Sequence, residues 1–143
     1  MNTSRLLRLV NILTEIDDHV FDMNTWFEFD LDNGPSGCAC GWGALDPILN
    51  GQGFKLLVEF YSTDGSVPVK SILVNNLAEL LELGNTAESD WECELIFEKA
   101  TGMDAVAQFF EVSFDIAHWL FGIRAGDELP KEVRARINKL LTA

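Results

Sequence analysis

The sequence predicts one α+β domain over residues 1–143, in which a small antiparallel sheet of about three strands packs with helices from both ends of the chain. Three patterns lead to this fold class. Near the N-terminus, apolar residues recur every three or four positions, as on one face of a helix. Residues 91–98 alternate between apolar and mostly acidic side chains, as in a half-buried strand. Near the C-terminus, Pro130 precedes a second apolar stripe with helical spacing.

The first predicted helix begins at Thr3 or Ser4, whose hydroxyls are suited to N-capping. Its buried face consists of the apolar residues Leu6, Leu9, Leu13, Ile16 and Val20. Residues 17–32 mix acids with aromatic side chains and predict a short helix or turns, and residues 33–37 (Asn-Gly-Pro-Ser-Gly) predict a loop. A short helix is expected over 38–50, broken before Pro47 because proline disfavours helical geometry in the residue that precedes it.

The middle of the chain predicts most of the sheet. Two strands, 54–62 and 67–74, should form a hairpin around a turn at Asp64-Gly65. Residues 75–83 are helical by composition, and this helix should end at Gly84. The third strand covers 91–98, with two sets of side chains on opposite faces: Trp91, Cys93, Leu95 and Phe97 buried, and Glu92, Glu94 and Glu98 exposed.

The C-terminal part of the chain predicts three helices. Two of them cover 104–110 and 113–121, the second capped by Ser113 and stopped at Gly122. The last helix has Pro130 in its first turn. It should bury the apolar residues Val133, Ile137, Leu140 and Leu141.

The charge is strongly acidic, with 23 Asp and Glu against 10 Lys and Arg and a net charge of −13. Residues 15–32 carry seven acids and residues 88–98 carry five, and neither segment contains Lys or Arg. Direct nucleic-acid binding is therefore not expected, because such binding depends on cations at the phosphates. The acids solvate the surface, and they also suit a basic protein partner or an inhibitor that imitates DNA.

The composition also predicts a cytoplasmic protein without a membrane span. No run approaches 18 apolar residues, and the apolar N-terminal segment is interrupted at Arg8, Asn11 and Thr14, unlike a signal peptide. The cysteines are odd in number, and Cys38 and Cys40 are too close in sequence for a relaxed mutual disulfide. Reduced thiols in the cytoplasm are the simplest interpretation.

The most distinctive stretch is residues 34–44 (Gly-Pro-Ser-Gly-Cys-Ala-Cys-Gly-Trp-Gly-Ala), whose four glycines let the backbone turn sharply and approach a neighbour closely. We interpret it as a structural loop. Phe21, Trp26, Cys38 and Trp42 should cluster, and Gly37 and Gly41 should leave room for the indoles against the backbone.

Four stretches carry a resemblance to a known group of proteins. They are residues 21–26 (Phe-Asp-Met-Asn-Thr-Trp), 33–43, 107–112 (Ala-Gln-Phe-Phe-Glu-Val) and 118–121 (His-Trp-Leu-Phe). The pattern resembles small phage and bacterial proteins with Phe-x-Met-x-x-Trp followed by a Cys-Gly-Thr-x-Ala-Cys-x-x-Gly-Trp loop. The resemblance covers about 21–46 and 105–141 and implies a mobile-element origin but no activity. Asn33 stands at that group's first loop cysteine, so chemistry that needs both cysteines is not expected here.

Catalysis and metal binding have weak candidates. Cys38 or Cys40 near a helix N-terminus would have a lowered pKa, and only His19 or His118 is available as a base. A zinc site would have to draw on these residues and Cys93, but Cys-x-Cys is not the usual ligand spacing. The acids at 30–34 depart from a calcium loop, because Gly34 stands fifth instead of sixth and no Glu follows at position twelve. No metal or other cofactor is expected.

These patterns favour a small acidic accessory or interaction protein without catalysis. Two alternatives stay open, a cysteine-dependent enzyme using Cys38 or Cys40 and a DNA-imitating inhibitor of a DNA-processing enzyme. The expected partner is a protein. A mean hydropathy of +0.09 beside the net charge of −13 also predicts a homodimer, with the terminal segments as its interface because repulsive acids are fewest there.

Overall fold

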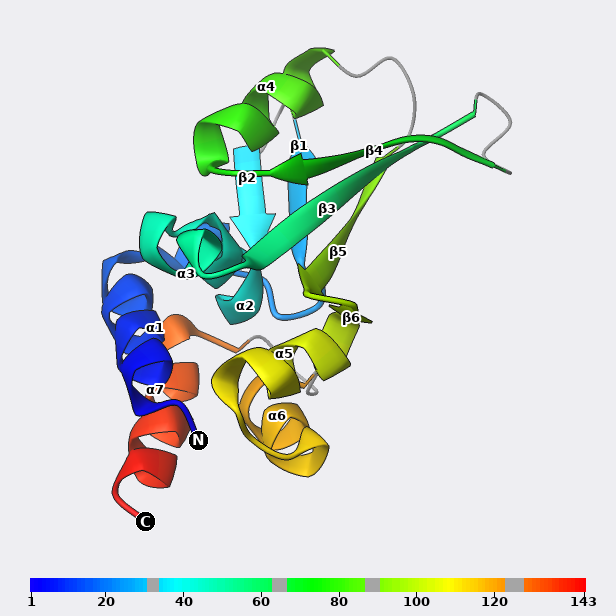
Figure 1. Ribbon diagram of the computed structural model, residues 1–143. Coiled ribbons are helices and arrows are strands. Elements are labelled where there is room, and N and C mark those ends of the chain that lie inside the picture. The colour runs from blue at the N-terminus through cyan, green and yellow to red at the C-terminus, as the bar shows by residue number, and fades with distance from the viewer. Residues whose placement is uncertain (31–33, 63–66, 87–90, 123–127) are drawn as a thin grey trace.

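The computed structural model describes residues 1–30, 34–62, 67–86, 91–122 and 128–143. It confirms the α+β class: helices surround a two-stranded antiparallel sheet (β1-β2) and a four-stranded antiparallel sheet in the order β4-β3-β5-β6 (Figure 1). The larger sheet has one strand more than expected because the two-residue strand β6 (Ala100–Thr101) folds back on β5. Within the described ranges, no helix is long and apolar enough to cross a membrane.

Helices from the two ends of the chain, α1 (Thr3–Glu15) and α7 (Pro130–Leu141), lie side by side (Figure 1). The predicted stripes face the core, fully at Leu6, Leu9, Leu13, Val133 and Ile137 and partly at Ile16, Val20, Leu140 and Leu141. The first stripe was predicted too long as a helix, because Ile16 is the extended C-cap of α1 and Val20 lies in the 3-10 turn that follows. The predicted cap was wrong. Asn2 caps α1, since its Oδ1 accepts the Arg5 amide at 3.1 Å, while Thr3 and Ser4 already lie in the first turn.

The segment after α1 contains more extended structure than predicted. It forms one 3-10 turn, η1 (Asp18–Val20), and then the strands β1 (Phe27–Asp30) and β2 (Gly34–Gly37), paired from Phe27↔Gly37 to Asp30↔Gly34. The predicted turns and loop were therefore wrong over these strands, and Asn33 lies outside the described residues. Pairing with β1 overrides the turn preference of Gly-Pro-Ser-Gly, a context effect typical of strands.

The predicted broken helix is confirmed as α2 (Ala39–Leu45) and α3 (Pro47–Gly51). Asp46 has extended geometry between them, as the residue before a proline should. Its carboxylate caps α3 by accepting the amides of Ile48 and Leu49, both at 3.1 Å. All seven residues of α2 are buried.

The predicted hairpin is confirmed as β3 (Phe54–Tyr61) and β4 (Pro68–Val74), with a bulge at Phe60/Tyr61. The predicted turn at Asp64-Gly65 lies outside the described residues. Strand β5 (Trp91–Phe97) is also confirmed and pairs with the other side of β3. One face of the sheet buries Leu56, Val58 and Leu95, whereas Leu57 and Leu73 on the opposite face are half-buried and exposed.

The predicted burial pattern of β5 holds only in part. Leu95 is buried and Glu92 and Glu98 are exposed, but three apolar residues expected to be buried are only half-buried: Trp91, Cys93 and Phe97. For Trp91 and Cys93 the reason is a cleft above the strand. Glu94 is half-buried instead of exposed, because its carboxylate folds back onto the Leu95 amide at 2.9 Å.

Helix α4 (Leu77–Thr86) continues through Gly84, so the predicted stop at this glycine was wrong. Gly84 is needed for packing instead, since a Cβ there would lie 2.6 Å from Cδ1 of Phe29. The helices α5 (Gly102–Phe110) and α6 (Phe114–Phe121) match the prediction, with Ser113 Oγ accepting the Ile116 amide at 3.1 Å and Gly122 ending α6. Helix α5 supplies much of the aromatic core, where Phe109 stacks on Phe54 at 4.3 Å.

Candidate functional site

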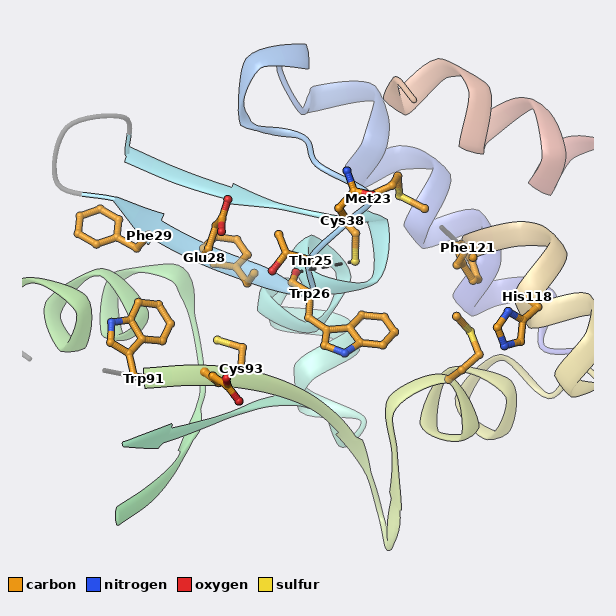
Figure 2. A pocket seen from close by; sticks show the side chains of 15 residues that line it. Met23, Thr25, Trp26, Glu28, Phe29, Cys38, Trp91, Cys93, His118 and Phe121 are labelled. Atoms are coloured by element: carbon orange, nitrogen blue, oxygen red, sulfur yellow. Dashed lines mark hydrogen bonds between the residues drawn. The ribbon is translucent and has the colours of Figure 1, made fainter. Parts of the chain in front are cut away.

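A cleft of about 910 Å³ lies between β1 and β5 and is closed at one end by α5 and α6 (Figure 2). We call it the β1–β5 cleft. Residues 23–29 form one wall, and residues 91–93 of β5 form the opposite wall. The remaining lining residues are Cys38, Met103, His118, Phe121 and Gly122.

The wall formed by residues 23–29 is held in place by backbone contacts with the glycine-cysteine loop. Phe21 forms a bridge with Gly37, and the Asp22 amide donates to the Gly37 carbonyl at 2.9 Å. The Cys38 amide donates to the Thr25 carbonyl at 3.1 Å. These contacts fix the chain on both sides of Trp26 before β1 begins.

The two glycines of this loop make room for backbone and for a phenyl ring. A Cβ on Gly41 would lie 1.7 Å from the Trp26 carbonyl oxygen, and a Cβ on Gly37 would lie 2.5 Å from Cδ2 of Phe27. The expectation that they accommodate the indoles was therefore wrong. The close approach belongs to the Trp26 carbonyl, and the Trp26 indole extends into the cleft instead (Figure 2).

Trp42 is a core residue on the other side of this wall. Its indole is only 9% exposed, and Nε1 donates to the Val20 carbonyl at 3.0 Å. Its ring meets the Phe27 ring edge to face at 4.9 Å. The structure thus places Phe21, Cys38 and Trp42 in one core cluster with Trp26 packed against it, as predicted. The Trp26 indole also lines the cleft.

The pKa values of the three cysteine thiols are raised, whereas a nucleophilic cysteine needs a lowered pKa. Burial raises the pKa of Cys38 to about 11, outweighing the hydrogen bond from the Gly41 amide to Sγ at 3.4 Å. Burial also raises the pKa of Cys40 well above its ordinary value and that of Cys93 to about 12. The predicted lowering of the pKa near a helix N-terminus was wrong, because desolvation of the thiolate dominates.

The positions of the two histidines do not by themselves support a thiol mechanism. His118 lines the same cleft as Cys38 and is exposed, whereas His19 is exposed in η1. In the described part of the chain, no three His, Cys, Asp or Glu side chains are grouped so that they could hold a metal ion. Most of the acidic stretch 30–34 lies outside the described residues.

The cleft combines aromatic rings with negative charge. Trp26 and Trp91 line it together with the acidic residues Glu28 and Glu92, and its lining includes no Lys or Arg from the described residues. On β5 the Glu92 side chain points to the opposite face of the sheet from Trp91 and Cys93, where Glu59 lies directly across from it. Glu28 comes from the acid-rich segment 15–32 and Glu92 from the segment 88–98. The Tyr61 hydroxyl donates to Glu92 at 3.2 Å and helps to position that carboxylate.

Sequence reasoning placed Trp26 and Cys38 in a structural loop but did not assign Trp91, Glu92 or Glu28 to a site. The two acid-rich segments were the available signal, because each contributes one acidic residue to the lining of the cleft. Comparisons of this chain with protein-family models, curated proteins and solved structures give no match. The chemistry of the cleft is therefore the basis for assigning a function.

Proposed function

We propose that the protein is a non-catalytic interaction module that binds a cationic group of a partner protein in the β1–β5 cleft. The observation that supports this proposal is the pair of indoles, Trp26 and Trp91, that line one cleft together with two acidic residues, Glu28 and Glu92. A cation over an indole face gains about 0.5–2 kcal/mol, with the larger gain in desolvated sites. Arginine suits such a site best, because its planar guanidinium stacks on rings and pairs with carboxylates.

The net charge of −13 adds long-range attraction to the same partner. Charge of one sign raises the association rate of an oppositely charged protein, and this effect falls with ionic strength. The raised pKa values of Cys38 and Cys93 favour a binding role over thiol catalysis, since the thiolate is the nucleophile.

The proposal is tested with acetylated hexa-arginine amide, titrated into the protein at low salt while tryptophan fluorescence and binding heat are recorded. Replacing the two acidic residues of the cleft lining (Glu28→Gln with Glu92→Gln) should weaken binding at least tenfold. The matched control (Glu15→Gln with Glu132→Gln) removes two exposed carboxylates on α1 and α7 and should change the affinity less than twofold. Equal losses in both double variants would mean that net charge alone attracts the peptide, and the cleft would not be the site.

The cytoplasmic location and the mobile-element origin are also proposals. The cytoplasmic location is supported by the three free thiols, Cys38, Cys40 and Cys93. The mobile-element origin is supported only by the resemblance of 21–46 and 105–141. Protein purified from its host without reductant should contain three titratable thiols after denaturation, and a disulfide would count against the cytoplasm.

A homodimer through the terminal segments also stays a proposal. Its support is exposed apolar surface at Leu7 of α1 and, just before the C-terminal segment, at Phe114 and Trp119 of α6. Sedimentation at high micromolar concentration should give twice the chain mass of 16.0 kDa, and a 16.0 kDa species would contradict the dimer.

A further inference from the structure

One edge of β5 is open along most of its length. On one side, β5 pairs with β3 from Trp91 to Phe97. On the other side, within the described residues, β5 pairs with β6 at Ile96 and Phe97. The stretch 91–95 therefore has no neighbouring strand on that side among the residues that the structure describes.

The backbone groups at this open edge can be identified from one hydrogen bond. The Leu95 amide donates to the side chain of Glu94 at 2.9 Å and so does not belong to the ladder with β3. In an antiparallel strand, the N–H and C=O groups of successive residues point alternately to the two sides. The N–H and C=O groups of Trp91 and Cys93 therefore point to the same open side as the Leu95 amide.

The open edge borders the β1–β5 cleft. The side chains of Trp91 and Cys93 rise from β5 toward β1 (Figure 2), on the same face of the sheet as the buried Leu95. A strand added at this edge would place every second side chain beneath β1, next to Trp91 and Cys93. Its other side chains would lie on the opposite face of the sheet.

That opposite face carries an unusual concentration of acids. Glu59 on β3 lies directly across from Glu92 on β5, and Glu94 follows two residues later on the same face. Like charges directly opposite each other destabilise a sheet. The nearby cation on β3 does not relieve this pair, because the Lys55 ammonium donates to Asn50 at 2.9 Å and Asn75 at 3.2 Å.

We propose that an extended basic segment of the partner adds to the open edge of β5 as a further strand. This inference rests on the proposed function and specifies the form of the partner. Backbone hydrogen bonds to Trp91 and Cys93 hold the segment in register, as in strand addition by peptides. One of its cationic side chains enters the cleft between the indoles, and the flanking cations face Glu59, Glu92 and Glu94. A basic strand is the occupant because the indoles of Trp26 and Trp91 lie on the cleft side of this edge, and acids lie on the opposite face of the sheet.

The first test compares two peptides of equal charge. Acetylated hexa-arginine amide should bind at least tenfold more tightly than the same peptide with its four central amides N-methylated, because methylation removes the donors that a strand needs in either register. Affinities within twofold of each other would overturn strand addition. If the binding of both peptides were still weakened by Glu28→Gln with Glu92→Gln, the proposed function would stand without strand addition. If this double variant bound both peptides as tightly as the wild type, the proposed function and strand addition would both be wrong.

The second test reads the backbone of the protein directly. Amide hydrogen exchange, measured by NMR with and without hexa-arginine, should slow at least tenfold at Trp91 and Cys93. The amides of Glu92 and Glu94 serve as internal controls, since they point toward β3 and should keep their exchange rates. Unchanged exchange at Cys93 in the saturated complex would overturn the proposal, even if the peptide binds in the cleft.

Discussion

The carbonyl oxygen of Trp26 occupies the position from which a side chain on Gly41 would extend. A Cβ on Gly41 would lie only 1.7 Å from that oxygen and 2.8 Å from the carbonyl carbon. The first turn of α2 is thereby packed directly against the backbone that precedes β1. Because the Trp26 indole lines the β1–β5 cleft, this contact between two backbones links the core to the candidate site.

Replacing Gly41 with alanine should destabilise the protein by about 3 kcal/mol, because neither backbone can yield to the new methyl group. Gly51→Ala is the matched control at the end of α3, where a Cβ would meet nothing within 4 Å. That variant should stay within about 1 kcal/mol of the wild type. Urea unfolding measures the stability of both variants. Equal stability of the two would disprove the close approach of Gly41 to the Trp26 carbonyl.

Two replacements of Trp42 separate ring packing from hydrogen bonding. Trp42→Ala removes a buried indole and should cost about 3–5 kcal/mol. Trp42→Phe keeps a ring against Phe27 but loses the donor to the Val20 carbonyl, and should cost markedly less. Thermal and urea unfolding provide the comparison. Equal losses in the two variants would show that ring packing contributes little.

The helices and the main hairpin followed from local patterns, because their periodicity reflects one buried face. Strand β2 did not, since its Gly-Pro-Ser-Gly sequence has no strand preference of its own and becomes extended only by pairing with β1. The alternation of Phe27 and Phe29 with Glu28 and Asp30 is the strand signal that β1 carries in the sequence. Gly84 was misread for a related reason: its role depends on Phe29, which is distant in sequence.

The candidate site was less accessible to sequence reasoning than the fold. The acid-rich segments were visible, but their meeting at one cleft depends on how β1 lies over β5. The thiols were also ambiguous, because a cysteine at a helix N-terminus is either activated by the dipole or silenced by burial. For Cys38, whose side chain is almost fully buried, burial prevails.

The cysteines should react slowly with iodoacetamide in the native protein near pH 8. Burial raises the pKa of Cys38 to about 11 and that of Cys93 to about 12, so the thiolate fraction of each is small. Cys38 and Cys40 are also shielded from the reagent by burial. Denatured protein should incorporate three labels rapidly, one at each cysteine. Peptide mass mapping identifies the sites. Rapid labelling of Cys38 or Cys40 in the folded state would favour the cysteine-enzyme alternative.

A buried carboxylate ties α1 to α3. Arg8 Nη2 donates to Asp46 Oδ1 at 2.5 Å, and Arg8 Nε donates to Oδ2 at 3.1 Å. Burial alone raises the pKa of Asp46, but the hydrogen bonds from Arg8 and from the amides of Leu49 and Ile48 outweigh it. The net result is a pKa below the ordinary 3.8. The ionised form of Asp46 is thus favoured by folding.

The stability that Asp46 contributes should therefore depend on acid pH. Because its pKa is lower in the folded than in the unfolded protein, the contribution is complete above the unfolded value of about 4 and disappears as the pH falls through the folded value. Asp46→Asn keeps a capping oxygen but removes the charge, and should cost about 1 kcal/mol at pH 7.

Urea unfolding between pH 7 and pH 3 should show that the stability difference between wild type and Asp46→Asn shrinks below about pH 4. Arg8→Gln should raise the pKa of Asp46 and move the acid loss of stability to higher pH. A difference between wild type and Asp46→Asn that stays constant down to pH 3 would mean that the carboxylate is not stabilised by its partners.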